Sequence, residues 1–196
     1  MKKIVFFGDS LTAGYGLSSP DSESLPALIN ERLVTSGRHY DVVNAGISGD
    51  TTRAARLRIE NYVNLDMALF VLELGANDFL RGYSPAEVEQ NLQFMIDRVR
   101  EKSPAVPILL LGIELPLWIA NSYVDGYRKI FSILSFRNNI SLIPSFLKGV
   151  SGNRALNMID GVHPLAAGYH IAAENIWPSI KKLIAEKPSD IIERRE

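Results

Sequence analysis

The sequence predicts an α/β protein in which a five-stranded parallel sheet lies between two layers of helices, a three-layer α/β/α sandwich. Short, almost wholly apolar runs alternate along the chain with longer amphipathic stretches. Such runs are typical of strands that are buried on both faces of a parallel sheet. The chain has 196 residues and no internal repeat or low-complexity linker, which favours a single domain.

The five predicted strands are apolar runs that are too short to be buried helices. They cover residues 4–7, 42–43, 67–74, 108–111 and 140–143. Because strand and helix alternate throughout, each connection is expected to cross over one face of the sheet.

The stretches between these runs have apolar residues at helical spacing. They predict helices over residues 24–36, 51–63, 122–136 and 165–184, and a further helix that starts at Ser84. Ser84 is the expected N-cap of that helix, Pro85 fits its first position, and Glu87 completes a capping box. In the helix over 51–63, Arg53, Arg56 and Arg58 are expected to form an outward-facing basic surface.

One domain is predicted over residues 1–184, followed by a charged tail over 185–196. The last twelve residues carry seven charged side chains. This composition favours a solvated tail or a fraying helix end over a packed element.

The composition excludes several classes of protein. A hydrophobic content of 46% and a net charge of −1 are unlike a disordered chain, and no basic stripe predicts a nucleic-acid partner. No apolar run approaches the ~20 residues of a spanning helix, so stable membrane insertion is not expected. The absence of cysteine excludes disulfides, thiolate metal sites and a cysteine nucleophile.

The start of the chain bears on its compartment. Met1, Lys2 and Lys3 resemble the beginning of a signal peptide, but the apolar run that follows has four residues, where a signal needs roughly seven to fifteen. As written, the chain is therefore expected to be cytoplasmic. A periplasmic or secreted protein from which a signal peptide was removed is the alternative.

The unusual residues of the chain follow the predicted strands, where ligands bind in open α/β sheets. Gly8-Asp9-Ser10 follows the first strand, the stretch over 44–52 follows the second, and Gly75-Ala76-Asn77-Asp78 follows the third. Asp160 and His163 stand just before the last helix. These loops are expected to line one common cleft.

The residue types in these loops suit acyl transfer. A serine hydroxyl is a weak nucleophile until a base takes its proton, and that base needs an orienting carboxylate. Ser10, His163 and Asp160 can supply these three groups. The oxyanion that develops needs preorganised donors, for which the Ser10 N–H, the Gly46 N–H and the Asn77 side-chain amide are candidates.

The chain resembles the SGNH (GDSL) hydrolase superfamily on these residues, and in particular its thioesterase I, arylesterase and lysophospholipase branch. The stretches VNAGISGDTT (43–52) and LELGANDFLRGY (72–83) are similar to signatures of that branch, and the resemblance covers residues 3–184. One departure is Ala76, where many members have a second glycine.

The resemblance implies a flavodoxin-like SGNH hydrolase fold with strand order 2-1-3-4-5. It implies Ser10 as the nucleophile, His163 as the general base and acid, and Asp160 as the partner of His163. Gly46 and Asn77, with the Ser10 amide, become the oxyanion donors. No metal and no cofactor are implied.

Several of these residues have alternative roles. Asp78 competes with Asp160 but is more simply a brace for its own loop, and Asp9 is expected to bond nearby backbone in a turn. Gly46 has the alternative of a tight turn that needs a positive φ. Glu73, an acid within an apolar strand, has no assigned role.

Candidate substrate-binding residues follow the third and fourth strands. Leu80, Ile113, Leu115 and Pro116 are expected to border Ser10, and an apolar lining favours an acyl chain over a sugar. Ordinary loop packing explains each of them about as well.

The predicted function is a serine acyl hydrolase that cleaves carboxylic esters, acyl thioesters or both, with a small-molecule substrate as its partner. A carbohydrate acetyl esterase with the same triad is the first alternative. A flavodoxin-like nucleotide-binding module is a remote one, because neither Gly-x-Gly-x-x-Gly nor a P-loop motif occurs. The Gly-x-Ser-x-Gly elbow of the α/β-hydrolase fold is also absent.

Overall fold

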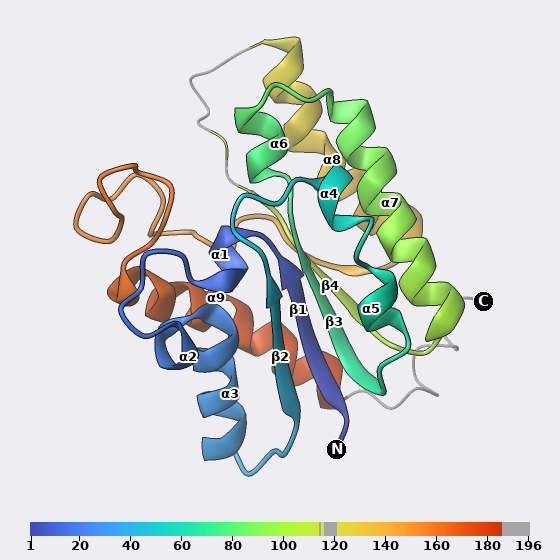
Figure 1. The fold of residues 1–196 in the computed structure, drawn as a ribbon, viewed down its shortest axis with the longest axis vertical. Helices are drawn as coiled ribbons and strands as arrows, with labels where there is room; N and C mark the ends of the chain where they lie inside the picture. Colours follow the sequence, from blue (N-terminus) through green and yellow to red (C-terminus); the bar gives the residue numbers. More distant parts are fainter. Residues whose placement is uncertain (114, 116–120, 186–196) are drawn as a thin grey trace.

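The structure is a computed structural model that describes residues 1–113, 115 and 121–185. Its sheet has the order β2-β1-β3-β4-β5, and every neighbouring pair is parallel. Figure 1 shows the sheet between two helical layers. The predicted fold class and strand order are confirmed. The strands are β1 (Lys3–Gly8), β2 (Asp41–Gly46), β3 (Met67–Glu73), β4 (Ile108–Leu111) and β5 (Ser141–Ile143).

The helices cover the two faces of the sheet unequally. On one face lie α3 and α9, and on the other lie α4, α5, α7 and α8 (Figure 1). The helices are α1 (Ser10–Ala13), α2 (Pro20–Glu23), α3 (Leu25–Thr35), α4 (Thr52–Ala55), α5 (Glu60–Val63), α6 (Ala76–Leu80), α7 (Pro85–Lys102), α8 (Ser122–Asn138) and α9 (Ala166–Ala185).

The inner strand β1 lies between two apolar cores. Val5 and Phe7 pack in the core under α7 and α8, whereas Ile4 and Phe6 pack in the core under α3 and α9. All four side chains are at most 1% exposed. Burial on both faces explains why β1 appears in the sequence as a continuous apolar run.

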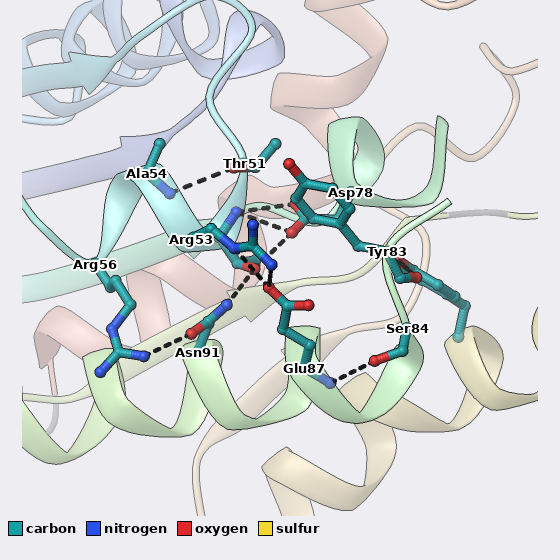
Figure 2. Close-up of polar contacts among 11 residues, drawn as sticks. Thr51, Arg53, Ala54, Arg56, Asp78, Tyr83, Ser84, Glu87 and Asn91 are labelled. Atoms are coloured by element: carbon teal, nitrogen blue, oxygen red, sulfur yellow. Dashed lines mark hydrogen bonds and ion pairs between the residues drawn. The ribbon is translucent and has the colours of Figure 1, made fainter. Parts of the chain in front are cut away.

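The start of α7 follows the sequence prediction only in part. The Ser84 hydroxyl accepts a hydrogen bond from the Glu87 N–H at 3.2 Å, and Pro85 occupies the first turn. The Glu87 carboxylate does not complete the capping box, because it accepts a hydrogen bond from Arg53 Nε at 2.8 Å (Figure 2). This ion pair links α4 to α7.

The prediction of a single helix over residues 51–63 is wrong. The chain forms α4 and α5, separated by a turn over residues 56–59. The expected outward basic surface is also wrong for one member: the Arg53 side chain is 61% exposed, but that of Arg58 is 13% exposed. The short helices α1, α2 and α6 lie where loops were expected.

The register of the sheet brings three functional segments into one row. Gly8 of β1 is paired with Gly46 of β2 on one side and with Glu73 of β3 on the other. Each of these residues ends its strand, so the segments that follow them meet at the carboxyl edge of the sheet.

The predicted charged tail is left open by the end of the described chain. Helix α9 continues to Ala185, and the predicted tail beyond it lies outside the described residues. Among the helices of the described part, none is both long enough and apolar enough to cross a membrane.

Candidate active site

Ser10, His163 and Asp160 form a chain of short contacts at the carboxyl edge of the sheet. Ser10 Oγ lies 2.8 Å from His163 Nε2, and His163 Nδ1 lies 2.7 Å from Asp160 Oδ2. The three side chains come from α1 and from the loop before α9. This is the nucleophile, base and orienting-carboxylate arrangement that acyl transfer requires.

Asp160 is held as a carboxylate by its own loop. Slight burial raises its pKa, but hydrogen bonds from the main-chain and side-chain nitrogens of His163 and from the Val162 N–H outweigh this effect and lower the pKa to about 2. The ring of Tyr15 lies tilted against the imidazole of His163, with 4.7 Å between the two ring centres. Tyr15 is half exposed, so its ring covers one part of His163 while remaining open to solvent.

Ser10 stands at the first position of the four-residue helix α1. The preceding residue, Asp9, caps this helix, since its Oδ1 accepts a hydrogen bond from the Leu11 N–H at 3.0 Å. The Ser10 side chain is almost buried, with 7% of the residue exposed. The cap explains how a helix this short can hold the serine in a fixed direction.

Asn77 points toward the same loop. Its Nδ2 donates a hydrogen bond to Asp9 Oδ2 at 3.1 Å, although the two residues are 68 positions apart. A primary amide nitrogen carries two hydrogens, so one anchors Asn77 to Asp9 and the other is available to a ligand. The sequence prediction placed Asn77 in a loop, whereas it belongs to α6.

Asp9 and Glu73 form a buried acidic pair under the serine. Glu73 Oε2 accepts hydrogen bonds from Thr12 Oγ1 at 2.9 Å and from the Asp9 N–H at 3.3 Å. Burial raises the pKa of Asp9 to about 6, although the hydrogen bond from Leu11 opposes this shift. Burial and the charge of Asp9 raise the pKa of Glu73 well above its usual value.

Gly46 is needed at its position because of space, not because of a positive φ. It does not have a positive φ, and a Cβ there would lie 2.3 Å from Ala13 N and 2.8 Å from Asp9 O. The end of β2 therefore lies directly against α1. In this structure the Gly46 N–H donates to Asn44 Oδ1 at 3.0 Å, so an oxyanion at this position would take the place of the Asn44 side chain.

Asp78 does not contact His163. Its carboxylate accepts hydrogen bonds from the Thr52 N–H and from Thr52 Oγ1, the latter at 2.6 Å. Asn91 of α7 donates to the same hydroxyl at 3.2 Å, and Figure 2 shows this network between α4, α6 and α7. Asp78 thus fixes α6, which carries Asn77, to the rest of the fold.

The candidate substrate-binding residues have different surroundings. Leu80 is 63% exposed at the end of α6. Ile113 and Leu115 are half buried and pack against the core under α7 and α8. Pro116 lies outside the described residues.

The sequence did not predict a hollow that lies next to the Asp160 loop. It has a volume of about 650 Å³ and adjoins Asp160 through Ile159 and Gly161. Arg154 and Met158 also line it, so the hollow combines a cationic group with apolar surface. Within residues 1–113, 115 and 121–185, no three histidine or acidic side chains gather as a metal site.

Relatives with assigned names match nearly the whole chain. Esterase TesA from Pseudomonas aeruginosa is 37% identical over 92% of this chain and 89% of its own length. An arylesterase from Vibrio mimicus is 34% identical over 83% of this chain and 80% of its own length. The thioesterase 1/protease 1/lysophospholipase L1 of Escherichia coli is 35% identical over 82% of this chain and 74% of its own length.

Solved structures agree with this relationship. The crystal structure of TesA superimposes with a TM-score of 0.84 at 36% identity and covers 93% of this chain and 99% of its own. AlinE4, an esterase of the SGNH-hydrolase family, superimposes with a TM-score of 0.74 over 92% of this chain and 95% of its own. Residues 6–171 match the model of the GDSL-like lipase/acylhydrolase family. The chain therefore belongs to the GDSL-like lipase/acylhydrolase family, as its resemblance in sequence predicted.

Proposed function

We propose that this protein is a serine acyl hydrolase that cleaves carboxylic esters, acyl thioesters or both through an acyl-enzyme on Ser10. The contacts from Ser10 Oγ to His163 Nε2 at 2.8 Å and from His163 Nδ1 to Asp160 Oδ2 at 2.7 Å carry this proposal. Membership of an acylhydrolase family favours an enzyme over the nucleotide-binding module.

The reaction begins at the serine. Ser10 Oγ attacks the carbonyl carbon of the substrate while His163 Nε2 takes the hydroxyl proton, and the ionised Asp160 stabilises the imidazolium that forms. The tetrahedral intermediate collapses when His163 gives this proton to the leaving alcohol or thiol. Water that His163 activates then attacks the acyl-enzyme and releases the acid.

Three donors are proposed for the oxyanion of the intermediate: the Ser10 N–H, the Gly46 N–H and the second hydrogen of the Asn77 amide. The sheet register supports this proposal. Gly46, Gly8 and Glu73 are paired at the ends of their strands, so the loops that follow β2, β1 and β3 lie together at one edge of the sheet. The anchoring of Asn77 on Asp9 restricts the direction of its free N–H before substrate arrives, which is how such donors contribute most.

The proposed substrate carries a small to medium acyl chain. The relatives are named as an esterase, an arylesterase and a thioesterase/lysophospholipase. The apolar Leu80, Ile113 and Leu115 lie in the segments that follow β3 and β4. An apolar lining favours an acyl chain. A carbohydrate acetyl esterase would use the same triad and differs in the length of the acyl group that it accepts.

The experiment that tests this proposal measures hydrolysis of p-nitrophenyl esters from acetate to laurate by the wild-type protein and by Ser10→Ala, with acyl thioesters of the same chain lengths alongside. We expect turnover that peaks at medium chains and is lost in Ser10→Ala. A sharp preference for acetate would shift the proposal to the carbohydrate esterase. Wild-type activity in Ser10→Ala would refute the role of Ser10.

A further inference from the structure

We infer that Arg58 is a positioning residue for the oxyanion donors: its guanidinium holds the peptide group between Ala45 and Gly46, and with it the Gly46 N–H. This inference rests on the proposed function, which makes the Gly46 N–H a donor to the oxyanion. Arg58 acts from the carbonyl side of this peptide and is not proposed to touch a substrate.

The guanidinium of Arg58 binds the ends of two strands at once. Nη1 donates to Ala45 O at 2.8 Å, and Nη2 donates to Gly8 O at 2.9 Å. In the sheet, Ala45 and Gly8 stand one position apart along the paired ends of β2 and β1. Gly8 is followed by Asp9 and Ser10, and Ala45 is followed by Gly46, so one side chain connects the nucleophile segment to the second oxyanion segment.

Because of the geometry of the peptide bond, the contact between Arg58 and the Ala45 oxygen also sets the direction of the Gly46 N–H. A trans peptide is planar, and its C=O and N–H point in opposite directions; the described chain has no cis peptide. When Arg58 fixes the oxygen of Ala45, it therefore fixes the direction of the Gly46 N–H. The positive charge beside the carbonyl oxygen also polarises the amide, which makes its N–H a stronger donor to an anion.

Arg58 is itself held in place on its remaining sides. Its Nε donates to Asp50 Oδ2 at 2.7 Å, and the guanidinium carbon lies 4.0 Å from the centre of the Phe7 ring. Both side chains of the ion pair are nearly buried, at 13% and 10% exposure. A planar guanidinium with five donors can serve an acid and two carbonyls together, whereas a lysine ammonium is a point charge on a flexible stem.

The Gly46 N–H is occupied by Asn44 Oδ1 in this structure. The peptide is thus held by a cation at its oxygen and by a neutral acceptor at its nitrogen. An oxyanion is a stronger acceptor than an amide oxygen because it carries charge. It can replace Asn44 without any movement of the peptide, provided that Arg58 keeps the carbonyl where it is.

Arg56 provides a matched control two residues away. Its Nη1 donates to Asn91 Oδ1 at 2.9 Å, and its guanidinium lies 4.3 Å from the centre of the Phe94 ring. Figure 2 shows that Arg56 extends toward Asn91 on α7. It therefore shares with Arg58 a side-chain acceptor and an aromatic neighbour, but its hydrogen bond goes to Asn91 and not to a carbonyl of the catalytic loops.

The test compares Arg58→Met with Arg56→Met in kcat and KM for a p-nitrophenyl ester. We expect Arg58→Met to lower kcat by about 100-fold, as for a misplaced or lost oxyanion donor, with KM changed by less than about threefold. We expect Arg56→Met to stay within about threefold of wild-type kcat. Added methylguanidinium should restore part of the kcat of Arg58→Met and none in Arg56→Met.

A second readout does not depend on turnover. In ¹H–¹⁵N spectra of the free protein, the Gly46 amide resonance should move in Arg58→Met and remain in place in Arg56→Met. If Arg58→Met does not fold, Arg58→Lys against Arg56→Lys makes the same comparison. In that pair we expect a loss of about tenfold in kcat for Arg58→Lys alone, because the cation remains while the planar fork is lost.

The outcomes separate this inference from the proposed function. If Ser10→Ala is inactive but the Arg58 variant matches its Arg56 control in kcat and in the Gly46 resonance, the role of Arg58 is refuted and the proposed function stands. A rise in KM without a fall in kcat would also refute it, since that points to substrate binding. Activity that survives in Ser10→Ala would refute the proposed function instead.

Discussion

The Asp160 carboxylate binds His163 twice. Its Oδ2 lies 2.7 Å from His163 Nδ1, and its Oδ1 accepts the main-chain N–H of the same residue at 3.0 Å. The first contact orients the imidazole and the second fixes the backbone from which the ring projects. A three-residue spacing is short enough for one carboxylate to do both, so Asp160 fixes the backbone and the ring of His163 from within its own loop.

Asp160→Asn should lower kcat by about 10³–10⁴-fold, because the amide can present a donor to Nδ1 and favour the wrong tautomer of His163. The fold should remain intact, since an asparagine oxygen can still accept the Val162 and His163 N–H groups. The measurement is kcat for a p-nitrophenyl ester together with a thermal melt. A loss below tenfold in a folded variant would assign the orienting role to another group.

Asn77→Ala should lower kcat by about 10²–10³-fold with little change in KM, because the amide is proposed to meet an oxyanion that exists only after attack. Asn138→Ala is a suitable control, since that amide binds Gln93 and the Leu134 carbonyl between α7 and α8. We expect the control to lose stability and keep its kcat. Equal kcat values in the two variants would remove Asn77 from the oxyanion site.

The fold could be predicted from the sequence where burial alone decides the structure. Strands such as β1 and β3 are apolar on both faces and therefore stand out as continuous runs. The segment over 51–63 could not be predicted in this way, since its break at 56–59 contains neither proline nor glycine. Tertiary contacts end α4 there, because the Arg58 side chain turns inward and binds carbonyls of β1 and β2.

Part of this error was visible in the sequence. At about 100° per residue, Arg58 lies roughly 140° around a helix from Arg53, so the two could not share one outward face even in an unbroken helix. The contacts within the site are harder to predict from the sequence. Asp9 meets Asn77 across 68 positions and Glu73 across 64, and the sequence carries no local signal of which side chains such loops bring together.

The buried pair of Asp9 and Glu73 should make the protein less stable as the pH rises. Each carboxyl has a raised pKa in the folded state, to about 6 for Asp9 and well above normal for Glu73. The folded protein therefore holds protons that the unfolded chain has already released, and the free energy of unfolding falls from about pH 4 upward. Glu73→Gln removes one of the two groups and should make this fall smaller.

Urea denaturation at several pH values between 4 and 8 measures this effect, with Glu60→Gln as the control. The Glu60 carboxylate is bonded to Arg98, which lowers its pKa. Its contribution has the opposite sign: it is present above about pH 4 and is lost as the pH falls. Parallel stability curves for wild type and Glu73→Gln would mean that Glu73 titrates alike in the folded and unfolded states.

Gly46→Ala should damage the site through contact with the backbone. The new Cβ would meet Ala13 N at 2.3 Å and Asp9 O at 2.8 Å, and neither atom can move without displacing α1 and Ser10. We expect a loss of about 1–3 kcal/mol in the free energy of unfolding and a large fall in kcat.

Gly126→Ala is the control, because its Cβ would press only on the Pro85 ring between α7 and α8. Both variants should lose stability, measured by urea denaturation, but only Gly46→Ala should lose kcat at a temperature where both are folded. Full kcat in Gly46→Ala would show that α1 can shift without cost to Ser10, and that the tight approach of β2 to α1 matters for folding alone.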